Sequence, residues 1–169
     1  EVHRFTSEPV SISGTMYWDV LNLFSEMKKG LAHARIEGKG QLSGIGCDSW
    51  GMDFGLIGKG DILLGNPCYY RDSRTNGMLE EAFGKVSRSE IFRYTGIQFL
   101  RFNTLYQFLS MVVSKSPLLQ MTQCFLMMAD LFNFFFTGVK VSEFTLATTS
   151  QVYNPVEGNW SRELLKKLG

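Results

Sequence analysis

One stretch indicates both the fold and a candidate site: Gly-Ile-Gly-Cys-Asp-Ser-Trp-Gly-Met-Asp-Phe, residues Gly44 to Phe54. The run Leu42–Cys47 is small and apolar, as in a strand covered on both faces, and a second apolar run covers Met52–Ile57. The residues between them predict a turn at Asp48–Gly51. In open α/β sheets ligands collect beyond the carboxyl ends of strands, where a glycine lets them approach the backbone. The turn is therefore a candidate binding site, although the local pattern by itself favours a plain turn glycine beside a core tryptophan.

The composition is that of a globular domain with an apolar core. The chain has 169 residues, of which 44% are hydrophobic and 20% are charged. Seventeen Lys and Arg against sixteen Asp and Glu give a net charge of +1, which offers no basic field for nucleic acid or for an anionic membrane surface. The most apolar segment, Cys124 to Val139, is shorter than a membrane span and contains Asp130. We therefore expect no nucleic-acid partner and no membrane partner.

The cysteines and histidines show no catalytic or metal-binding pattern. Cys47, Cys68 and Cys124 are widely spaced among apolar residues, which predicts buried free thiols in a reducing, cytoplasmic compartment. His3 and His33 neighbour no cysteine or carboxylate cluster, so neither a hydrolase triad nor a zinc site is supported. A phosphate loop of the Gly-x-x-x-x-Gly-Lys-Ser/Thr type is also absent from the sequence.

Hydrophobic periodicity predicts a sheet with helices packed on it. A strand at Val2–Phe5, a helix that begins after Asp19 and ends at Gly38 and Gly40, and the strand at Leu42 would form a strand–helix–strand unit. The later segments are expected as strands over 52–57, 61–64 and 124–128, as helices over 76–85, 87–95, 103–114, 130–136 and 161–168, and as a polar loop or strand edge over 143–151. Glycines at 84, 96 and 138 are the expected helix stops.

Four stretches resemble the FGGY carbohydrate kinase family. They are GCDSWGMDF at 46–54, YYRDSRTNG at 69–77, TGIQFLRFNTLYQ at 95–107 and TLATTSQ at 145–151. They stand in the family's order and span nearly the whole chain, and they are similar to the family's kinases for L-rhamnulose. The resemblance implies an α/β, ribonuclease H-like (actin-like ATPase) fold. It also implies that residues 1–169 form a single, incomplete N-terminal, sugar-side domain of a two-domain sugar kinase.

The resemblance further implies an activity and a set of site residues. Members of the family transfer the γ-phosphoryl group of ATP, with Mg²⁺, to a sugar hydroxyl, and the product from L-rhamnulose is L-rhamnulose 1-phosphate. By position, Gly51 matches the glycine that contacts the ketose, and Trp50 and Phe102 match residues that line the sugar pocket. This agrees with their chemistry, because a backbone group at Gly51 can bond a sugar hydroxyl while an aromatic face covers C–H surface.

Two motifs of the family are expected outside the sequence. The phosphate-binding hairpin would precede Glu1, and the motif with the catalytic Asp would follow Gly169. We therefore expect ATP and Mg²⁺ to be bound mainly by other parts of a longer protein. We expect no catalytic, cofactor-binding or metal-binding residue in this chain, and no activity from the chain alone. Two alternatives remain open, namely a kinase for another ketose and a non-catalytic sugar-binding or interaction fragment.

Overall fold

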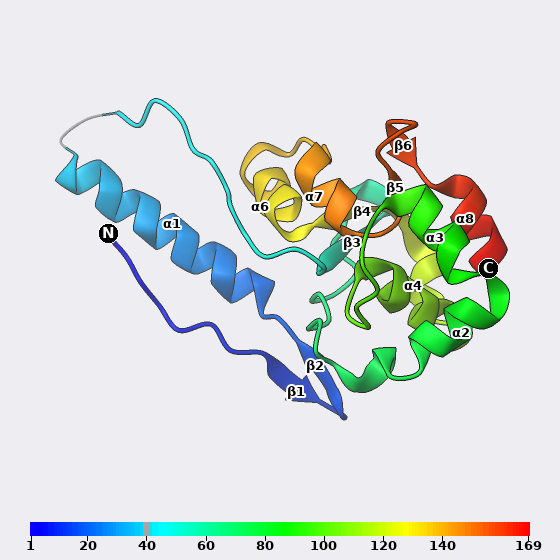
Figure 1. Cartoon of the computed structure of the whole chain (residues 1–169). Helices are drawn as coiled ribbons and strands as arrows, with labels where there is room; N and C mark the ends of the chain where they lie inside the picture. The colour runs from blue at the N-terminus through cyan, green and yellow to red at the C-terminus, as the bar shows by residue number, and fades with distance from the viewer. Residues whose placement is uncertain (39–40) are drawn as a thin grey trace.

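The computed structural model describes residues 1–38 and 41–169. Helices surround a short antiparallel strand pair, and helix α1 extends away from the rest of the chain (Figure 1). The helices are α1 Val20–Glu37, α2 Met78–Lys85, α3 Arg88–Thr95, α4 Thr104–Val113, α5 Pro117–Met121, α6 Met128–Thr137, α7 Phe144–Thr149 and α8 Arg162–Leu168. The strands are β1 Val10–Ile12, β2 Thr15–Tyr17, β3 Phe54–Gly58, β4 Thr122–Met127, β5 Tyr153–Asn154 and β6 Asn159–Trp160, and the 3₁₀ turns are η1 Lys59–Asp61 and η2 Ser73–Thr75.

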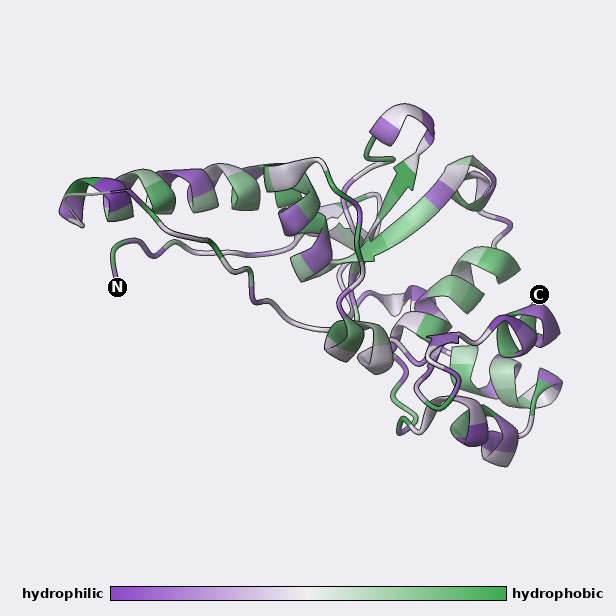
Figure 2. Cartoon of the chain, turned by 90° about the horizontal axis from the view of Figure 1, so that it is seen from above, coloured by the Kyte–Doolittle hydropathy of each residue, from purple (hydrophilic) through white to green (hydrophobic). Residues whose placement is uncertain are grey.

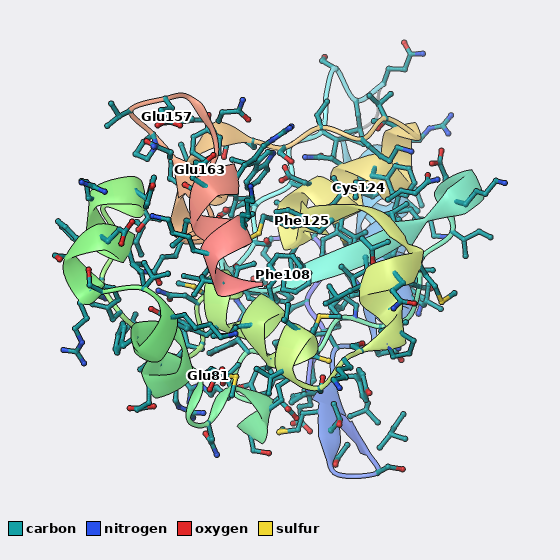
Figure 3. The ribbon with its side chains drawn as sticks, turned by 90° about the vertical axis from the view of Figure 1, so that its right-hand side faces the viewer. Glu81, Phe108, Cys124, Phe125, Glu157 and Glu163 are labelled. Atoms are coloured by element: carbon teal, nitrogen blue, oxygen red, sulfur yellow. The ribbon has the colours of Figure 1, made fainter. Side chains whose placement is uncertain are left out.

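The antiparallel pair of β3 and β4 lies at the centre of the core. Phe54 stands opposite Met127, and the register shifts at a bulge near the far end of β3. Phe125 of β4 meets Phe108 of α4 with ring centroids 5.0 Å apart, and the two rings lie together between the ribbons (Figure 3). Every residue of β3 is buried, as expected for an apolar strand that is covered on both faces.

The two faces of β3 pack against different helices. Phe54 stacks on Phe108 of α4 with ring centroids 4.4 Å apart, whereas Ile57 packs with residues of α1 and α6. Gly55 approaches α6 so closely that a Cβ at this position would lie 2.7 Å from Leu131 Cδ2. Burial on both faces holds β3 in place, and with it the turn that precedes the strand.

Helix α1 begins where the sequence predicts. Asp19 Oδ1 accepts a hydrogen bond from the backbone N–H of Asn22 at 3.0 Å, and the helix is capped by Gly38. The second predicted stop, Gly40, lies outside the described residues. Only the first turns of α1 reach the core, through Val20 and Leu23. The ribbon of α1 is coloured alternately for hydrophilic and hydrophobic residues along its length (Figure 2).

The predicted strand–helix–strand unit is wrong. Residues 2–5 and 41–50 are not strands, and the strands before α1 are the hairpin of β1 and β2. A strand needs a neighbour that satisfies its backbone N–H and C=O groups. No strand among the described residues pairs with the segment 42–47, so its apolar composition is not sufficient to make it one.

Most of the later predictions are confirmed. Strand β4 and helices α2, α3, α4, α6 and α8 overlap the expected segments, and Gly96 and Gly138 end α3 and α6 with φ of 68° and 72°. The stop at Gly84 is wrong, because α2 continues to Lys85. The expected strand over 61–64 is reduced to one antiparallel bridge between Ile57 and Leu63.

Helix α7 replaces the polar loop or strand edge that was expected over 143–151. The Glu143 carboxylate accepts hydrogen bonds from the backbone N–H groups of Thr145 and Leu146, both at 2.9 Å. The first N–H groups of a helix have no partner within the helix, and an acidic cap satisfies them. The Thr149 hydroxyl donates back to the Leu146 carbonyl at 2.8 Å, which accommodates a polar residue within the helix.

Glu143→Gln is expected to lower the melting temperature at neutral pH. Hydrogen bonds from Thr145 and from backbone N–H groups hold the pKa of Glu143 below its ordinary value of 4.5. The carboxylate therefore stabilises the folded state above that value, and the contribution is lost as the pH falls through the folded-state pKa. Thermal unfolding of both forms of the full-length protein that contains this chain, across the acidic range, measures the effect. A difference in melting temperature that does not change with pH would contradict it.

The three cysteines differ from the expectation in how far they are buried. Cys47, Cys68 and Cys124 are free thiols, but they are half-buried rather than buried. Their partial burial raises the pKa of each thiol.

Within the described part of the chain, no helix combines the length and the apolar character that crossing a membrane requires.

Candidate functional site

The stretch before β3 forms a tight turn. The backbone N–H of Asp53 donates to the Gly51 carbonyl at 3.0 Å, and Met52 between them has a φ of 79°. A bond from residue i+2 back to residue i with positive φ between them is a rare and strained γ-turn. The turn therefore lies later than the expected one at Asp48–Gly51. It stands at the amino end of β3 rather than at the carboxyl end of a preceding strand.

Helix α4 holds this strained turn in place. The Met52 carbonyl accepts hydrogen bonds from Thr104 Oγ1 at 2.7 Å and from Gln107 Nε2 at 3.1 Å. Both donors come from the first turn of α4, and both residues are buried. Backbone strain of this kind costs about 1–3 kcal/mol and persists only where the surroundings determine the conformation, which is frequent at ligand sites.

A fully buried carboxylate, Asp53, organises the side chains around the turn. Its Oδ2 accepts hydrogen bonds from Trp18 Nε1 at 2.6 Å, Trp50 Nε1 at 2.9 Å and the backbone N–H of Tyr70 at 3.3 Å. Its Oδ1 accepts one from Gln107 Nε2 at 3.2 Å. Burial raises the pKa of Asp53, although these four hydrogen bonds act in the opposite direction. The carboxylate thus fixes two indole rings and joins its own segment to three others, which contain Trp18, Tyr70 and Gln107.

Gln107 connects this turn to two other parts of the chain. Its Nε2 also lies 3.0 Å from the carbonyl of Phe102, in the loop before α4. Its Oε1 accepts a hydrogen bond from Arg74 Nη2 at 2.5 Å. A buried side chain that donates and accepts in this way ties the turn, the Phe102 loop and the η2 segment into one network.

A line of aromatic rings borders the turn. Trp50 packs on Trp18 with centroids 4.6 Å apart, and Trp18 meets Tyr69 at 4.9 Å. Tyr69 continues to Tyr70 at 4.8 Å, and Tyr70 to Phe102 at 5.6 Å. The line therefore runs from Trp50 to Phe102, residues 52 positions apart in the sequence. Aromatic faces of this kind pack well against apolar C–H surface.

Gly51 itself lies against helix α7. A Cβ at Gly51 would stand 3.1 Å from Thr149 Oγ1 and 3.7 Å from Thr149 Cβ. Gly51 is not among the glycines with positive φ, so it is the available space, rather than the backbone conformation, that favours glycine here.

The three residues singled out from the sequence occupy one neighbourhood. Gly51 is the first residue of the strained turn, Trp50 precedes it, and Phe102 is linked to it through Gln107. Residues that sequence reasoning missed complete the arrangement: Trp18, Asp53, Tyr69, Tyr70 and Gln107. All except Trp18 lie inside the stretches that carry the family resemblance, which is the signal that could have found them. A cavity of 460 Å³ nearby is lined by other residues.

The described residues form no cluster of metal-ligating side chains. Among them, no three His, Cys, Asp or Glu side chains come together in a way that could hold a metal ion. Asp53 directs its oxygens to four donors, so it is not disposed as a ligand for Mg²⁺, which binds through free carboxylate oxygens and waters.

A family model matches this sequence over almost its whole length. It describes the FGGY family of carbohydrate kinases, N-terminal domain, and covers residues 4–169. The chain therefore belongs to the FGGY family of carbohydrate kinases. Its fold is the α/β fold of the actin-like ATPases, represented by the N-terminal domain only. The fold class expected from the sequence is confirmed.

Curated relatives indicate more specifically which kinases of the family this chain is similar to. Rhamnulokinase from Oceanobacillus iheyensis is 38% identical over all 169 residues, and rhamnulokinase from Yersinia pestis bv. Antiqua is 40% identical over the same length. The chain spans 36% and 35% of the length of these two relatives. The predicted resemblance to rhamnulokinases is confirmed for the segment present.

Solved structures of sugar kinases share the fold. Gluconate kinase from Lactobacillus acidophilus has a TM-score of 0.87 at 20% identity, covering 97% of this chain and 34% of that one. Plasmodium falciparum glycerol kinase with ADP has a TM-score of 0.72 at 16% identity, covering 96% of this chain and 34% of that one. At such identities the likeness shows the fold alone.

Proposed function

We propose that this chain is the sugar-side part of the N-terminal domain of an ATP-dependent rhamnulokinase, which converts L-rhamnulose to L-rhamnulose 1-phosphate. Identities of 36–40% to rhamnulokinases over the whole chain support this assignment. The structural observation that carries it is the strained Gly51–Asp53 turn, which α4 holds in place and aromatic rings border. In this proposal residues 1–169 form a single, incomplete domain of a longer protein.

Gly51, Trp50 and Phe102 bind the ketose in this proposal. Gly51 offers backbone without a side chain, so that a sugar hydroxyl reaches a peptide group directly. The hydrogen bond from Trp50 to Asp53 fixes the orientation of the indole ring, and Phe102 lies against Tyr70 at the other end of the aromatic line. A few polar groups beside aromatic surface are what a sugar with hydroxyls on one face and C–H bonds on another requires.

The chain contributes to phosphoryl transfer by positioning the acceptor. The reaction needs an oriented hydroxyl, neutralisation of phosphate charge and a carboxylate that takes the proton. Asp53 is not proposed as that base, because it is 0% exposed and its oxygens already accept four hydrogen bonds. ATP with Mg²⁺ supplies the phosphoryl group and the charge neutralisation, and both are held mainly by other parts of the longer protein.

A panel of ketoses tests the proposed substrate in the full-length protein that contains this chain. ADP release is measured with L-rhamnulose, L-fuculose, L-ribulose and D-xylulose, and kcat/KM is expected to be highest for L-rhamnulose by at least about tenfold. A higher value with another ketose would assign the chain to a kinase for that sugar. Binding of L-rhamnulose without ADP release would support the non-catalytic alternative. The 169-residue chain alone is expected to release no ADP.

A further inference from the structure

One hydroxyl group, that of Thr149, faces the glycine at the start of the strained turn. Apart from the two chain neighbours of Gly51, only Thr149 among the described residues comes within 4 Å of the position that a Cβ on Gly51 would take. Its Oγ1 would lie 3.1 Å from that position and its Cβ 3.7 Å. Gly51 and Thr149 are both half-buried, so neither is sealed inside the core. The hydroxyl is therefore within reach of a ligand that meets the Gly51 backbone.

The Thr149 hydroxyl can accept a further hydrogen bond but has already used its proton. It donates this proton to the carbonyl of Leu146 at 2.8 Å, one turn earlier in α7. A threonine hydroxyl has one donor and two acceptor lone pairs. Within the described part of the chain, Thr149 Oγ1 forms no other hydrogen bond. The oxygen therefore offers its lone pairs to a donor, and each hydroxyl of a sugar is such a donor.

Helix α7 is tied to its neighbours at both ends, which fixes the position of Thr149. At the start of the helix, the backbone N–H of Glu143 donates to Asp130 Oδ1 of α6 at 3.1 Å. At its end, the carbonyl of Ser150 accepts a hydrogen bond from the backbone N–H of Leu105 in α4 at 3.1 Å. The same helix α4 holds the strained turn. A ligand that bridges the turn and Thr149 therefore meets groups that are already in place, which lowers the entropic cost of binding.

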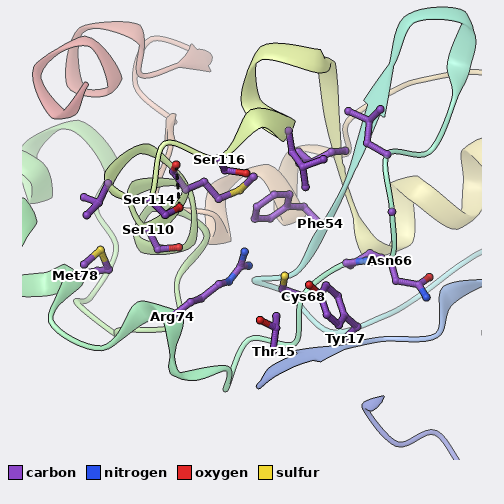
Figure 4. A pocket seen from close by; sticks show the side chains of 17 residues that line it. Thr15, Tyr17, Phe54, Asn66, Cys68, Arg74, Met78, Ser110, Ser114 and Ser116 are labelled. Atoms are coloured by element: carbon purple, nitrogen blue, oxygen red, sulfur yellow. Dashed lines mark hydrogen bonds between the residues drawn. The ribbon is translucent and has the colours of Figure 1, made fainter. Parts of the chain in front are cut away.

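The cavity of 460 Å³ near the turn is a separate space (Figure 4). It lies between the β1–β2 hairpin, β3 and the C-terminal end of α4, and neither Gly51 nor Thr149 lines it. Two hydroxyls that do line it, those of Ser110 and Ser114, donate to backbone carbonyls of α4 at 2.7 and 3.3 Å. A hydroxyl bonded back to its own helix is thus not special in this chain. The contact with Gly51 is what distinguishes Thr149.

We propose that Thr149 is a further ketose-binding residue, whose Oγ1 accepts a hydrogen bond from a sugar hydroxyl beside Gly51. This inference rests on the proposed function, because the turn is where the ketose is proposed to lie. Gly51 leaves room for the sugar at the backbone, and Thr149 adds an acceptor next to it. A ketose that places no hydroxyl at this point leaves the acceptor unpaired, so Thr149 contributes to the choice of sugar.

Thr149→Val tests the contact in the full-length protein that contains this chain, because it removes the hydroxyl and keeps the branched shape. The ketose is the one with the highest kcat/KM, which is L-rhamnulose in the proposed function. The substitution is expected to raise its Kd, measured by calorimetry, and its KM, measured by ADP release, at least about fivefold. The kcat and the KM for ATP are expected to change little. Thr149→Ser keeps the hydroxyl and is expected to keep the ketose Kd within about twofold.

Thr148→Val is the matched control. The Thr148 hydroxyl donates to the Thr145 carbonyl at 2.8 Å in the same helix, and it does not approach Gly51. The control therefore loses the same kind of bond within α7 and is expected to keep the ketose Kd. An unchanged Kd in Thr149→Val, or an equal rise in both Val variants, would overturn the contact. A Ser variant as weak as the Val variant would overturn it too.

Calorimetry separates a failure of this contact from a failure of the proposed function. A ketose that binds without ADP release, and binds less tightly to Thr149→Val, would support the contact and count against the kinase activity. Binding of no ketose to the unsubstituted protein would overturn both. Should Thr149→Val fail to fold, Thr149→Ala removes the same hydroxyl with a residue that favours a helix, and the same rise in ketose Kd is expected.

Discussion

Gly51→Val, made in the full-length protein that contains this chain, is expected to lower kcat/KM for the ketose by more than about tenfold, or about 1.4 kcal/mol, mainly through a higher KM. A Cβ at this position already stands 3.1 Å from Thr149 Oγ1. The branched side chain must therefore displace α7 or occupy the space beside the aromatic rings, where the ketose is proposed to lie. The KM for ATP is expected to change little, because ATP is proposed to bind mainly to parts of a longer protein outside this chain.

Gly55→Ala provides the matched control. It adds a methyl group 2.7 Å from Leu131 Cδ2 in the core between β3 and α6, so it is expected to lower the melting temperature while the folded molecules keep their ketose KM. Melting temperature and KM are measured on the same preparation of each variant. A Gly51→Val protein with a lower melting temperature and an unchanged ketose KM would remove Gly51 from the site.

Asp53→Leu is expected to lower the free energy of unfolding by about 3 kcal/mol or more, since each buried donor left without a partner costs about 1–3 kcal/mol. The substitution removes the acceptor for the indole N–H groups of Trp18 and Trp50 and for the amide of Gln107. Denaturant unfolding of the full-length protein measures the loss. A Leu variant as stable as the unsubstituted protein would show that these hydrogen bonds contribute nothing net.

Asp53→Asn separates the charge from the shape of the side chain. Burial raises the pKa of Asp53 above its ordinary 3.8, so the folded state takes up a proton at a higher pH than the unfolded state. The unsubstituted protein is therefore expected to gain stability relative to Asp53→Asn as the pH falls through the folded-state pKa towards 3.8. A stability difference that stays constant over this window would contradict a raised pKa.

Local signals in the sequence were sufficient to predict most of the helices. Asp19 caps α1 through its own side chain, Ser87 caps α3 in the same way, and Gly96 ends α3 with positive φ. Each signal acts within a few residues, so it is readable without knowledge of the fold. Helix α7 was missed because its run of Thr and Ser resembles a loop, while its stabilising cap, Glu143, is one side chain whose role depends on the helix being formed.

The sequence by itself determined the family, most of the helical segments and the residues proposed to meet the ketose, because motifs and caps are properties of short stretches. Only the tertiary structure decided that Leu42–Cys47 forms no strand and that Asp53 is buried among two indole rings and a glutamine. Gln107 and Met52, which form a hydrogen bond, lie 55 positions apart in the sequence. Strand pairing and buried polar networks require partners from distant segments, and such partners are chosen only when the whole chain packs together.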